Sequence, residues 1–414
     1  MLAALEIREK SSQGNKKLTN IGMEREDTPT QDVSREASGQ GVRILLAAGG
    51  TGGHIYPAVA LAEALVALAP GVQIQFCCGN RPAEWQIYRR LGIQPWILPV
   101  TYHRRGLAAR GRFLRQMLGA WAESRRLLRH SPVQVAVGFG SYVSVPPLLN
   151  ARLGGARLVL HEQNLYPGLA NRILAPFARA IATAGPLTRP VFPAARTHEV
   201  GNPIRAEILR PVSREEARAF FRLKPDRLVC LCMGGSQGAR GINRLVLETL
   251  QRNLDTDSPA SRWQFLWSTG MANFEAVSQT LKQMGVDPSE HGINPYLDEM
   301  ALAYAASDLV LTRAGALSIA ELTARGLPAV LVPLPTAAGG HQAINARRLV
   351  QAGAAEVLEE ADPRAAETLE KLLSHWVRNP QALARVGEAS KAQGRPDAAR
   401  DLAQLVLEVA AKRI

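Results

Sequence analysis

The fold class is indicated by residues 42–62, which read V-R-I-L-L-A-A-G-G-T-G-G-H-I-Y-P-A-V-A-L-A. Its apolar run at 42–48 is typical of a buried strand, and Pro57 is expected in the first turn of a helix that continues to about Ala69. The glycines between them let backbone N–H groups approach a phosphate, and the helix N-terminus adds partial positive charge. The segment therefore predicts a strand, a phosphate-binding turn and a helix.

The same pattern returns at R-L-V-C-L-C-M-G-G-S-Q-G-A-R, residues 227–240. Other strand-like runs alternate with helical segments, and they lie at 72–78, 133–139, 157–161, 263–268, 308–312 and 329–333. Such alternation indicates parallel, doubly wound sheets with helices on both faces. We therefore expect an α/β protein made of two Rossmann-like halves, each with one glycine-rich turn.

The length of 414 residues also favours two domains. We expect a disordered polar extension at 1–40, a first domain at 41–203 and a second at 204–390. An amphipathic helix in 391–414 is expected to pack back on the first domain.

Composition restricts the environment of the chain. Lys and Arg outnumber Asp and Glu by 49 to 36, and the net charge of +13 favours polyanions or an anionic membrane surface as partners. The four cysteines show no C-x-x-C pair and no metal-ligand spacing, so they are expected to be reduced core thiols: Cys77, Cys78, Cys230 and Cys232. No apolar stretch is long enough to span a bilayer, so any membrane contact is expected to be peripheral.

Two common nucleotide chemistries are disfavoured. The second strand ends F-C-C-G-N at 76–80, without the acid that chelates a dinucleotide ribose, and neither turn is a G-x-x-x-x-G-K-[ST] loop. The D-x-D sequence at Asp255–Asp257 lies in a polar connection, so we predict no metal site there. A two-domain glycosyltransferase is the leading interpretation.

Six ordered motifs strengthen it: G-G-T-G-G-H at 49–54, G-F-G-S-Y-V-S at 138–144, H-E-Q-N at 161–164, G-N-P-I-R at 201–205, G-G-S-Q-G-A-R at 234–240, and H-Q with N-A at 341–346. Together they resemble the MurG family from about Val42 to the C-terminus. The resemblance implies a GT-B fold and transfer of N-acetylglucosamine from its UDP donor to undecaprenyl-diphosphoryl-muramoyl-pentapeptide. It places the acceptor on the first half and the UDP-sugar on the second.

The resemblance also implies an environment and partners. The expected location is the cytoplasmic face of the bacterial inner membrane, peripherally bound, with no cofactor and no nucleic acid. The expected partners are UDP-N-acetylglucosamine, the undecaprenyl-linked acceptor, an anionic membrane surface and cell-wall synthesis proteins.

Donor-binding residues are expected mainly in the second half. Residues 309–321 predict a strand that gives way through Gly315 to a helix, whose first turn can face a diphosphate and whose Glu321 can bind ribose hydroxyls. The alternative for Glu321 is an acid that complements the helix dipole. By resemblance the donor site comprises Arg205, Ser236, Gln237, Leu297, Ala316, Leu317, Ser318, Glu321 and Gln342, with Asn345 beside them. The glycines at 339–340 replace acidic residues expected in the family.

Inverting transfer needs a base for the acceptor hydroxyl and positive potential at the departing UDP. His54 is the first candidate base because its pKa range suits proton transfer near neutrality; the alternatives are a helix cap or a ligand of the acceptor phosphate. Glu162 is the second candidate, and Asn164 can bind sugar hydroxyls or the acetamido group. Thr51, Gly52 and Gly53 complete the expected acceptor turn.

Residues 102–130 hold eight arginines against one acid, interleaved with apolar residues at helical spacing. We expect a membrane-docking surface that includes Arg105, Phe113, Met117 and Trp121. The alternative is a helix that packs its apolar stripe inward.

Three other functions stay open on sequence alone. A diacylglycerol glycosyltransferase or a UDP-sugar epimerase could use the same fold. An NAD-linked oxidoreductase and a non-catalytic membrane-binding protein are the alternatives from other classes.

Overall fold

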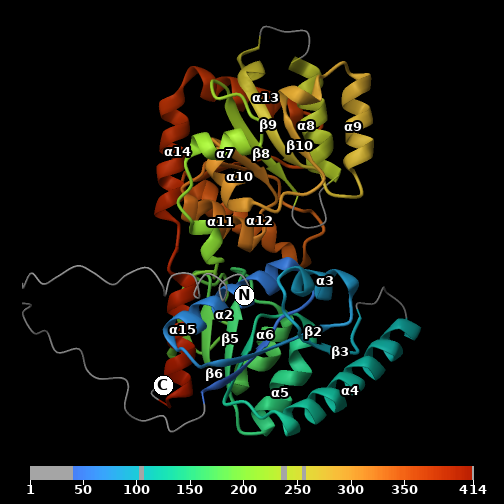
Figure 1. Cartoon of the computed structure of the whole chain (residues 1–414), viewed down its shortest axis with the longest axis vertical. Coiled ribbons are helices and arrows are strands. Elements are labelled where there is room, and N and C mark those ends of the chain that lie inside the picture. The colour runs from blue at the N-terminus through green and yellow to red at the C-terminus, as the bar shows by residue number, and fades with distance from the viewer. Residues whose placement is uncertain (1–40, 102–106, 235–239, 254–257, 413–414) are drawn as a thin grey trace, which may run out of the picture.

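The chain forms two α/β halves, one above the other in Figure 1. The computed structural model describes residues 41–101, 107–234, 240–253 and 258–412. The chain passes from the first half to the second near residues 200–205 and returns near 393–397 (Figure 1). Several features predicted from the sequence lie outside the described residues: Arg105, Ser236, Gln237, the extension at 1–40 and the Asp255–Asp257 sequence.

Each half contains one parallel sheet. The order of the first sheet is β3 (Trp96–Leu98), β2 (Gln73–Gly79), β1 (Arg43–Ala47), β4 (Val135–Gly138), β5 (Arg157–Glu162), β6 (Ala178–Thr183) and β7 (Thr197–Glu199). The order of the second is β10 (Gly292–Asn294), β9 (Trp263–Ser268), β8 (Leu228–Met233), β11 (Leu309–Thr312), β12 (Ala329–Leu331) and β13 (Ala355–Val357). In both halves the strand order reverses beside the first strand, and a doubly wound sheet binds its ligands in the crevice at that reversal.

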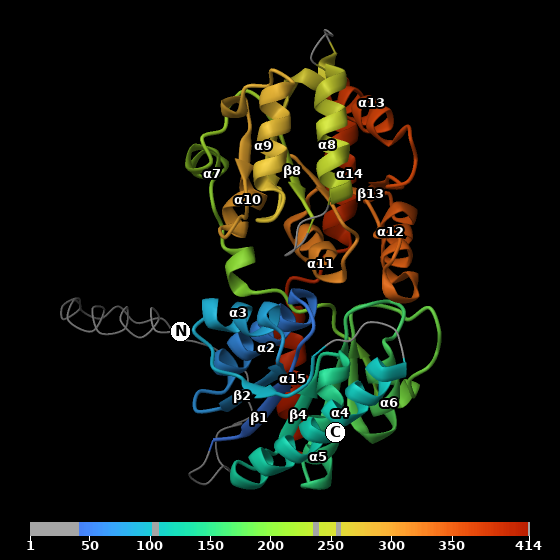
Figure 2. The ribbon, with the colours of Figure 1, turned by 90° about the vertical axis from the view of Figure 1, so that its right-hand side faces the viewer.

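Helices cover the sheets of both halves (Figure 2). The longer helices of the first half are α2 (Gly52–Leu68), α3 (Pro82–Arg90), α4 (Leu107–His130), α5 (Val145–Leu153) and α6 (Leu169–Leu174). Those of the second half are α7 (Arg214–Phe220), α8 (Arg240–Asn253), α9 (Phe274–Gln283), α10 (Met300–Ala306), α11 (Ala316–Arg325), α12 (His341–Gln351), α13 (Ala365–Arg378) and α14 (Pro380–Ala392). Short 3-10 turns join them at Tyr142–Ser144, Ala175–Phe177, Ala194–Arg196, Ala206–Leu209, Pro259–Arg262, Pro288–Glu290 and Ala338–Gly340.

Strand β1 shows why its sequence is apolar without interruption. Ile44 and Leu46 belong to the core on one face of the sheet, whereas Leu45 and Ala47 belong to the core on the other face. Successive side chains of a strand point to opposite faces, and helices bury both faces here.

The last helix, α15 (Ala398–Ala410), belongs to the first half although it follows the second half in sequence. Its Leu402, Val406 and Val409 are fully buried in the same core as Ile44 and Leu46. The Arg157 guanidinium donates hydrogen bonds to the carbonyls of Val409 and Ala410 (2.8 and 2.9 Å), which closes the C-terminal end of the helix. The chain therefore crosses the junction between the halves twice.

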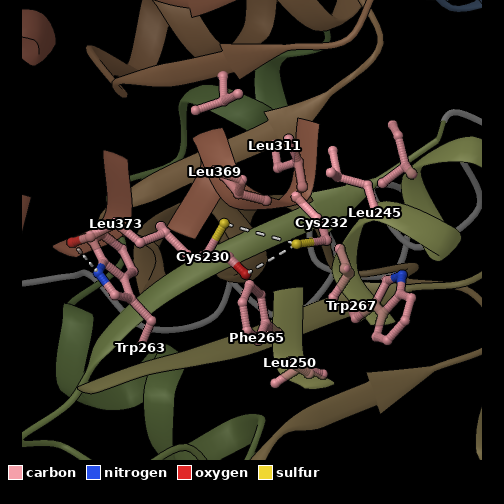
Figure 3. Close-up of a cluster of buried hydrophobic side chains, with 14 of the residues drawn as sticks. Cys230, Cys232, Leu245, Leu250, Trp263, Phe265, Trp267, Leu311, Leu369 and Leu373 are labelled. Atoms are coloured by element: carbon pink, nitrogen blue, oxygen red, sulfur yellow. Dashed lines mark hydrogen bonds between the residues drawn. The ribbon is translucent and has the colours of Figure 1, made fainter. Parts of the chain in front are cut away.

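The core of the second half is rich in aromatic and sulfur-containing side chains (Figure 3). Trp263 donates from its indole nitrogen to the Leu373 carbonyl at 3.1 Å, which ties β9 to α13. The sulfur atoms of Cys230 and Cys232 lie 3.8 Å apart, and all four cysteines are buried and free. Their burial agrees with the prediction of core thiols.

The doubly wound class is confirmed, with two local differences from the expectation. Helix α2 begins at Gly52, so Pro57 lies inside the helix rather than in its first turn. Strands β3, β6, β10 and β13 were not anticipated. Three of them are three residues long, and β6 reads A-R-A-I-A-T, whose alanines have weak strand propensity.

None of the helices in the described parts of the chain is both long enough and apolar enough to cross a bilayer.

The α15 packing yields a stability prediction. Leu402→Ala removes a fully buried side chain and leaves a cavity, so the free energy of unfolding should fall by about 2–5 kcal/mol. Gln404→Ala, on the exposed side of the same helix, should change it by less than about 0.5 kcal/mol. Urea titration measures both, and equal values for the two variants would contradict the packing of α15.

Candidate active site

The first glycine turn joins β1 to α2, and a buried acid accepts a hydrogen bond from its backbone. Glu84 is fully buried, its carboxylate accepts the Gly79 N–H at 2.8 Å, and it also accepts a backbone hydrogen bond from Gly50. Gly50 has φ +90°, a conformation that disfavours any side chain. Glu84 is the first acid after β2, and it binds loop backbone rather than a ribose.

His54 lies in the first turn of α2 and points towards the end of β4. Its Nδ1 lies 3.2 Å from the Thr51 hydroxyl. A Cβ added to Gly140 would lie 3.5 Å from His54 Nε2, an ordinary contact distance, so the imidazole lies beside the loop that follows β4. Burial and the nearby charge of His341 lower the pKa of His54 to about 4. The imidazole is therefore neutral at pH 7 and can accept a proton.

The other candidate base, Glu162, ends β5 and is 2% exposed. Its carboxylate accepts hydrogen bonds from the Asn164 N–H (3.1 Å), the Gly168 N–H (2.9 Å) and the Asn171 amide (2.9 Å). Burial raises the pKa of Glu162, and these hydrogen bonds oppose the rise. The contacts make Glu162 the organiser of the loop at 163–168.

In the second half, the N-terminus of α11 provides backbone hydrogen-bond donors. Its N-cap is Gly315, and among the described residues no side chain caps the N–H groups of the first turn, which includes Ala316, Leu317 and Ser318. The first backbone N–H groups of a helix have no partner within the helix, so this turn can bind an anion.

Glu321 lies in the second turn of α11 and is 7% exposed. Its carboxylate accepts a hydrogen bond from the Tyr304 hydroxyl at 2.8 Å. Burial raises the pKa of Glu321, while the Tyr304 hydrogen bond and the charge of Arg205 oppose the rise. Tyr304 was missed from the sequence because it lies within the apolar run of α10, where nothing marks it as polar.

Arg205 follows the crossing between the halves and reaches the same region. Its guanidinium pairs with Glu207 at 2.5 Å, and its side chain is 12% exposed. Since its charge acts on Glu321, the structure brings these two predicted donor residues together.

The remaining predicted donor residues have mixed surroundings. Leu297 is buried in the core beside α10, so only its backbone can line a base pocket. The Gln342 side chain accepts the Leu334 N–H at 2.8 Å and closes the loop before α12. The Asn345 amide donates to the Ala314 carbonyl at 3.3 Å and contacts the Asn164 side chain at 3.5 Å. This last pair joins the two halves.

The surface of α4 differs from the expectation for membrane docking. Phe113 and Met117 pack against the core of the first half, and the Phe113 ring meets the Tyr142 ring edge-on at 5.4 Å. Trp121 is also half-buried. The exposed apolar side chains of this helix are Leu114 (62%) and Leu118 (63%). The apolar residues predicted as one helical face are therefore divided: Phe113, Met117 and Trp121 face inward, whereas Leu114 and Leu118 face solvent.

No metal centre is evident in the described ranges. There, no three His, Cys, Asp or Glu side chains are grouped so that they could hold an ion.

The comparisons with known proteins agree with this geometry. Models of the glycosyltransferase family 28 N-terminal and C-terminal domains match residues 44–183 and 229–402. Relatives from Halothermothrix orenii and Nitratidesulfovibrio vulgaris are 38% and 39% identical, over 89% and 86% of this chain and 99% and 94% of theirs. Both are named UDP-N-acetylglucosamine–N-acetylmuramyl-(pentapeptide) pyrophosphoryl-undecaprenol N-acetylglucosamine transferase. The chain belongs to the MurG family.

Solved structures support the same assignment. The crystal structure of MurG from Acinetobacter baumannii has a TM-score of 0.67 and 28% identity, covering 89% of this chain and 99% of that one. A UDP-N-acetylglucosamine 2-epimerase has a TM-score of 0.62 at 14% identity, which shows a shared fold alone. The GT-B fold and the glycosyltransferase class of this MurG family member are thus confirmed.

The role of Glu162 in its loop can be tested through stability. Glu162→Ala removes the acceptor of three hydrogen bonds, whose donors are the buried Asn171 amide, the half-buried Asn164 N–H and the exposed Gly168 N–H. An unsatisfied buried group costs about 1–3 kcal/mol, so we predict a loss of about 1–3 kcal/mol in unfolding free energy. Glu162→Gln keeps one oxygen and should lose less. Glu408→Ala, on an exposed helix face, is the control. An alanine variant as stable as the wild type would contradict this role.

Proposed function

We propose that this enzyme transfers N-acetylglucosamine, with inversion, from UDP-N-acetylglucosamine to undecaprenyl-diphosphoryl-muramoyl-pentapeptide in peptidoglycan synthesis. The observation that carries the proposal is the placement of His54 in the first turn of α2, with its Nδ1 beside the Thr51 hydroxyl, in a chain whose second half offers a helix N-terminus with Gly315 as its N-cap and a buried carboxylate. The family relationship gives the donor and the acceptor.

In the proposed mechanism the acceptor sugar lies on the first half, between the turn at 49–54 and Asn164. His54 takes the proton from the acceptor hydroxyl as its oxygen attacks the anomeric carbon of the donor. The bond from that carbon to the UDP oxygen breaks, and the UDP leaves with the electron pair. Glu162 keeps the loop that carries Asn164 in place.

On the donor side, the N–H groups at Ala316, Leu317 and Ser318 neutralise the departing diphosphate. Glu321 accepts hydrogen bonds from the ribose, Arg205 lies beside the uracil, and the backbone at Leu297 lines the base pocket. Gln342 binds the donor sugar, and Ser236 and Gln237 bind donor phosphate oxygens. The helix N–H groups then stabilise the negative charge of the departing diphosphate, as a metal ion does in D-x-D enzymes.

The direct test uses UDP-N-acetylglucosamine with a short-chain analogue of the lipid acceptor. We expect UDP release only when the acceptor is present, together with an acceptor product heavier by one N-acetylhexosamine. Epimerised donor formed without acceptor would favour the epimerase alternative. UDP binding without any turnover would favour a binding protein, and either result would overturn the proposal.

The pKa of His54 predicts a pH profile. A base must be deprotonated to act, and its pKa lies near 4, so kcat/KM should stay flat as the pH falls from 8 to about 5 and decline only below that. His54→Asn should lower kcat by about 10²- to 10⁴-fold. An acidic limb at pH 6.5 in the wild type, or a fully active asparagine variant, would rule out this base.

We also propose that α4 rests on the anionic cytoplasmic surface of the membrane, near cell-wall synthesis proteins. Leu114 and Leu118 are exposed among the arginines Arg110, Arg112 and Arg115, which can bind lipid headgroups.

This docking is tested with vesicles containing anionic lipid. Leu114→Asp with Leu118→Asp should weaken vesicle binding at least about tenfold, because two inserted side chains become charged. Met271→Asp, an exposed position in the second half, should not weaken it. Docking through α4 is wrong if the double variant binds as well as the control.

A further inference from the structure

Tyr56 lies in the site but has no part in the mechanism above. It follows His54 by two residues on α2 and is half-buried. One side of its ring packs on the glycine turn, because a Cβ added to Gly52 would lie 3.1 Å from Tyr56 Cε2. The Arg205 guanidinium lies over the ring, 4.3 Å from its centre. The ring is therefore enclosed between the acceptor turn and a donor residue.

The Tyr56 hydroxyl extends the contact to the second half. It hydrogen-bonds Tyr296, the residue before Leu297, and the Arg90 guanidinium of α3 lies 5.3 Å from the Tyr296 ring centre. Burial and the neighbouring Tyr296 raise the pKa of Tyr56 well above its ordinary value. The phenol therefore stays neutral across the physiological range.

Arg205 depends on this ring for its position. Glu207, its ion-pair partner, is 54% exposed at the side chain, so that ion pair is a weak constraint. The Arg205 Nε is buried and makes no hydrogen bond within the described residues. A cation over an aromatic face is stabilised more strongly when it is desolvated, as Arg205 is at 12% exposure. The aromatic face is thus a close contact of the guanidinium, in addition to the ion pair with Glu207 and the nearby charges of Glu63 and Glu321.

We propose that Tyr56 is a positioning residue that holds Arg205 for the nucleotide of the donor. The inference rests on the proposed function, because it takes Arg205 as a donor-binding residue. Since the same ring packs on Gly52, the donor residue is fixed by the helix that carries the catalytic His54. The position of α2 in the first half therefore affects how tightly the enzyme binds the UDP-sugar.

The test is a double-mutant cycle in the full-length enzyme. Tyr56→Leu keeps apolar bulk but removes the aromatic face, so the KM for UDP-N-acetylglucosamine should rise about tenfold while kcat changes less than about twofold. Tyr56→Phe keeps the face and should match the wild type. Because Tyr56 acts through Arg205, the Tyr56→Leu change should add less than about twofold in an Arg205→Ala background.

Trp85→Leu is the matched control, because the Arg89 guanidinium also lies over that ring, at 5.3 Å from its centre, on α3. It should leave the donor KM unchanged. Calorimetric titration with UDP repeats the cycle without turnover, and near-ultraviolet circular dichroism verifies that each variant is folded. Additive effects of Tyr56→Leu and Arg205→Ala, or an unchanged KM in Tyr56→Leu, would overturn the inference. A wild-type enzyme without acceptor-dependent UDP release would instead overturn the proposed function. The calorimetric cycle with UDP would still test whether Tyr56 positions Arg205.

Discussion

The structure depends on one constraint, which is that parallel strands need helical crossovers. All strands of a parallel sheet therefore end at the same edge, where the following helices begin. Each half has such an edge, and the first half carries its glycine turn there, after β1. The Asn164–Asn345 contact shows that the two edges meet, since Asn164 follows β5 and Asn345 lies in the second turn of α12. The return of α15 to the first half joins the halves a second time.

The loops at these edges carry many backbone N–H groups without partners in a sheet or helix, and buried acids satisfy several of them. Glu84 accepts from the turn after β2 and from the first glycine turn. Glu162 accepts from the loop after β5. Each buried carboxylate would be costly alone, and hydrogen bonds from the loop offset that cost. The loops are thereby fixed before any substrate binds.

Sequence reasoning was sufficient for features that depend on local pattern. The first glycine turn, the long apolar strands and the Gly315–Glu321 helix start all have local signatures, and the ordered motifs gave the family. The Tyr56–Arg205 contact has no such signature, because it joins residues 149 positions apart in sequence. The burial of Glu84 and the contact of Tyr304 with Glu321 depend in the same way on tertiary packing. The sequence of α4 left inward packing open as an alternative to membrane docking. An apolar stripe alone does not show which of its residues another element covers.

If the second half binds the nucleotide and the first half supplies the base, a crystal structure of the complex with UDP will show both roles. We expect ribose oxygens within hydrogen-bond distance of the Glu321 carboxylate and the diphosphate at the first turn of α11. A diphosphate bound instead in the turn at residues 49–54, with Glu321 remote from the nucleotide, would contradict it.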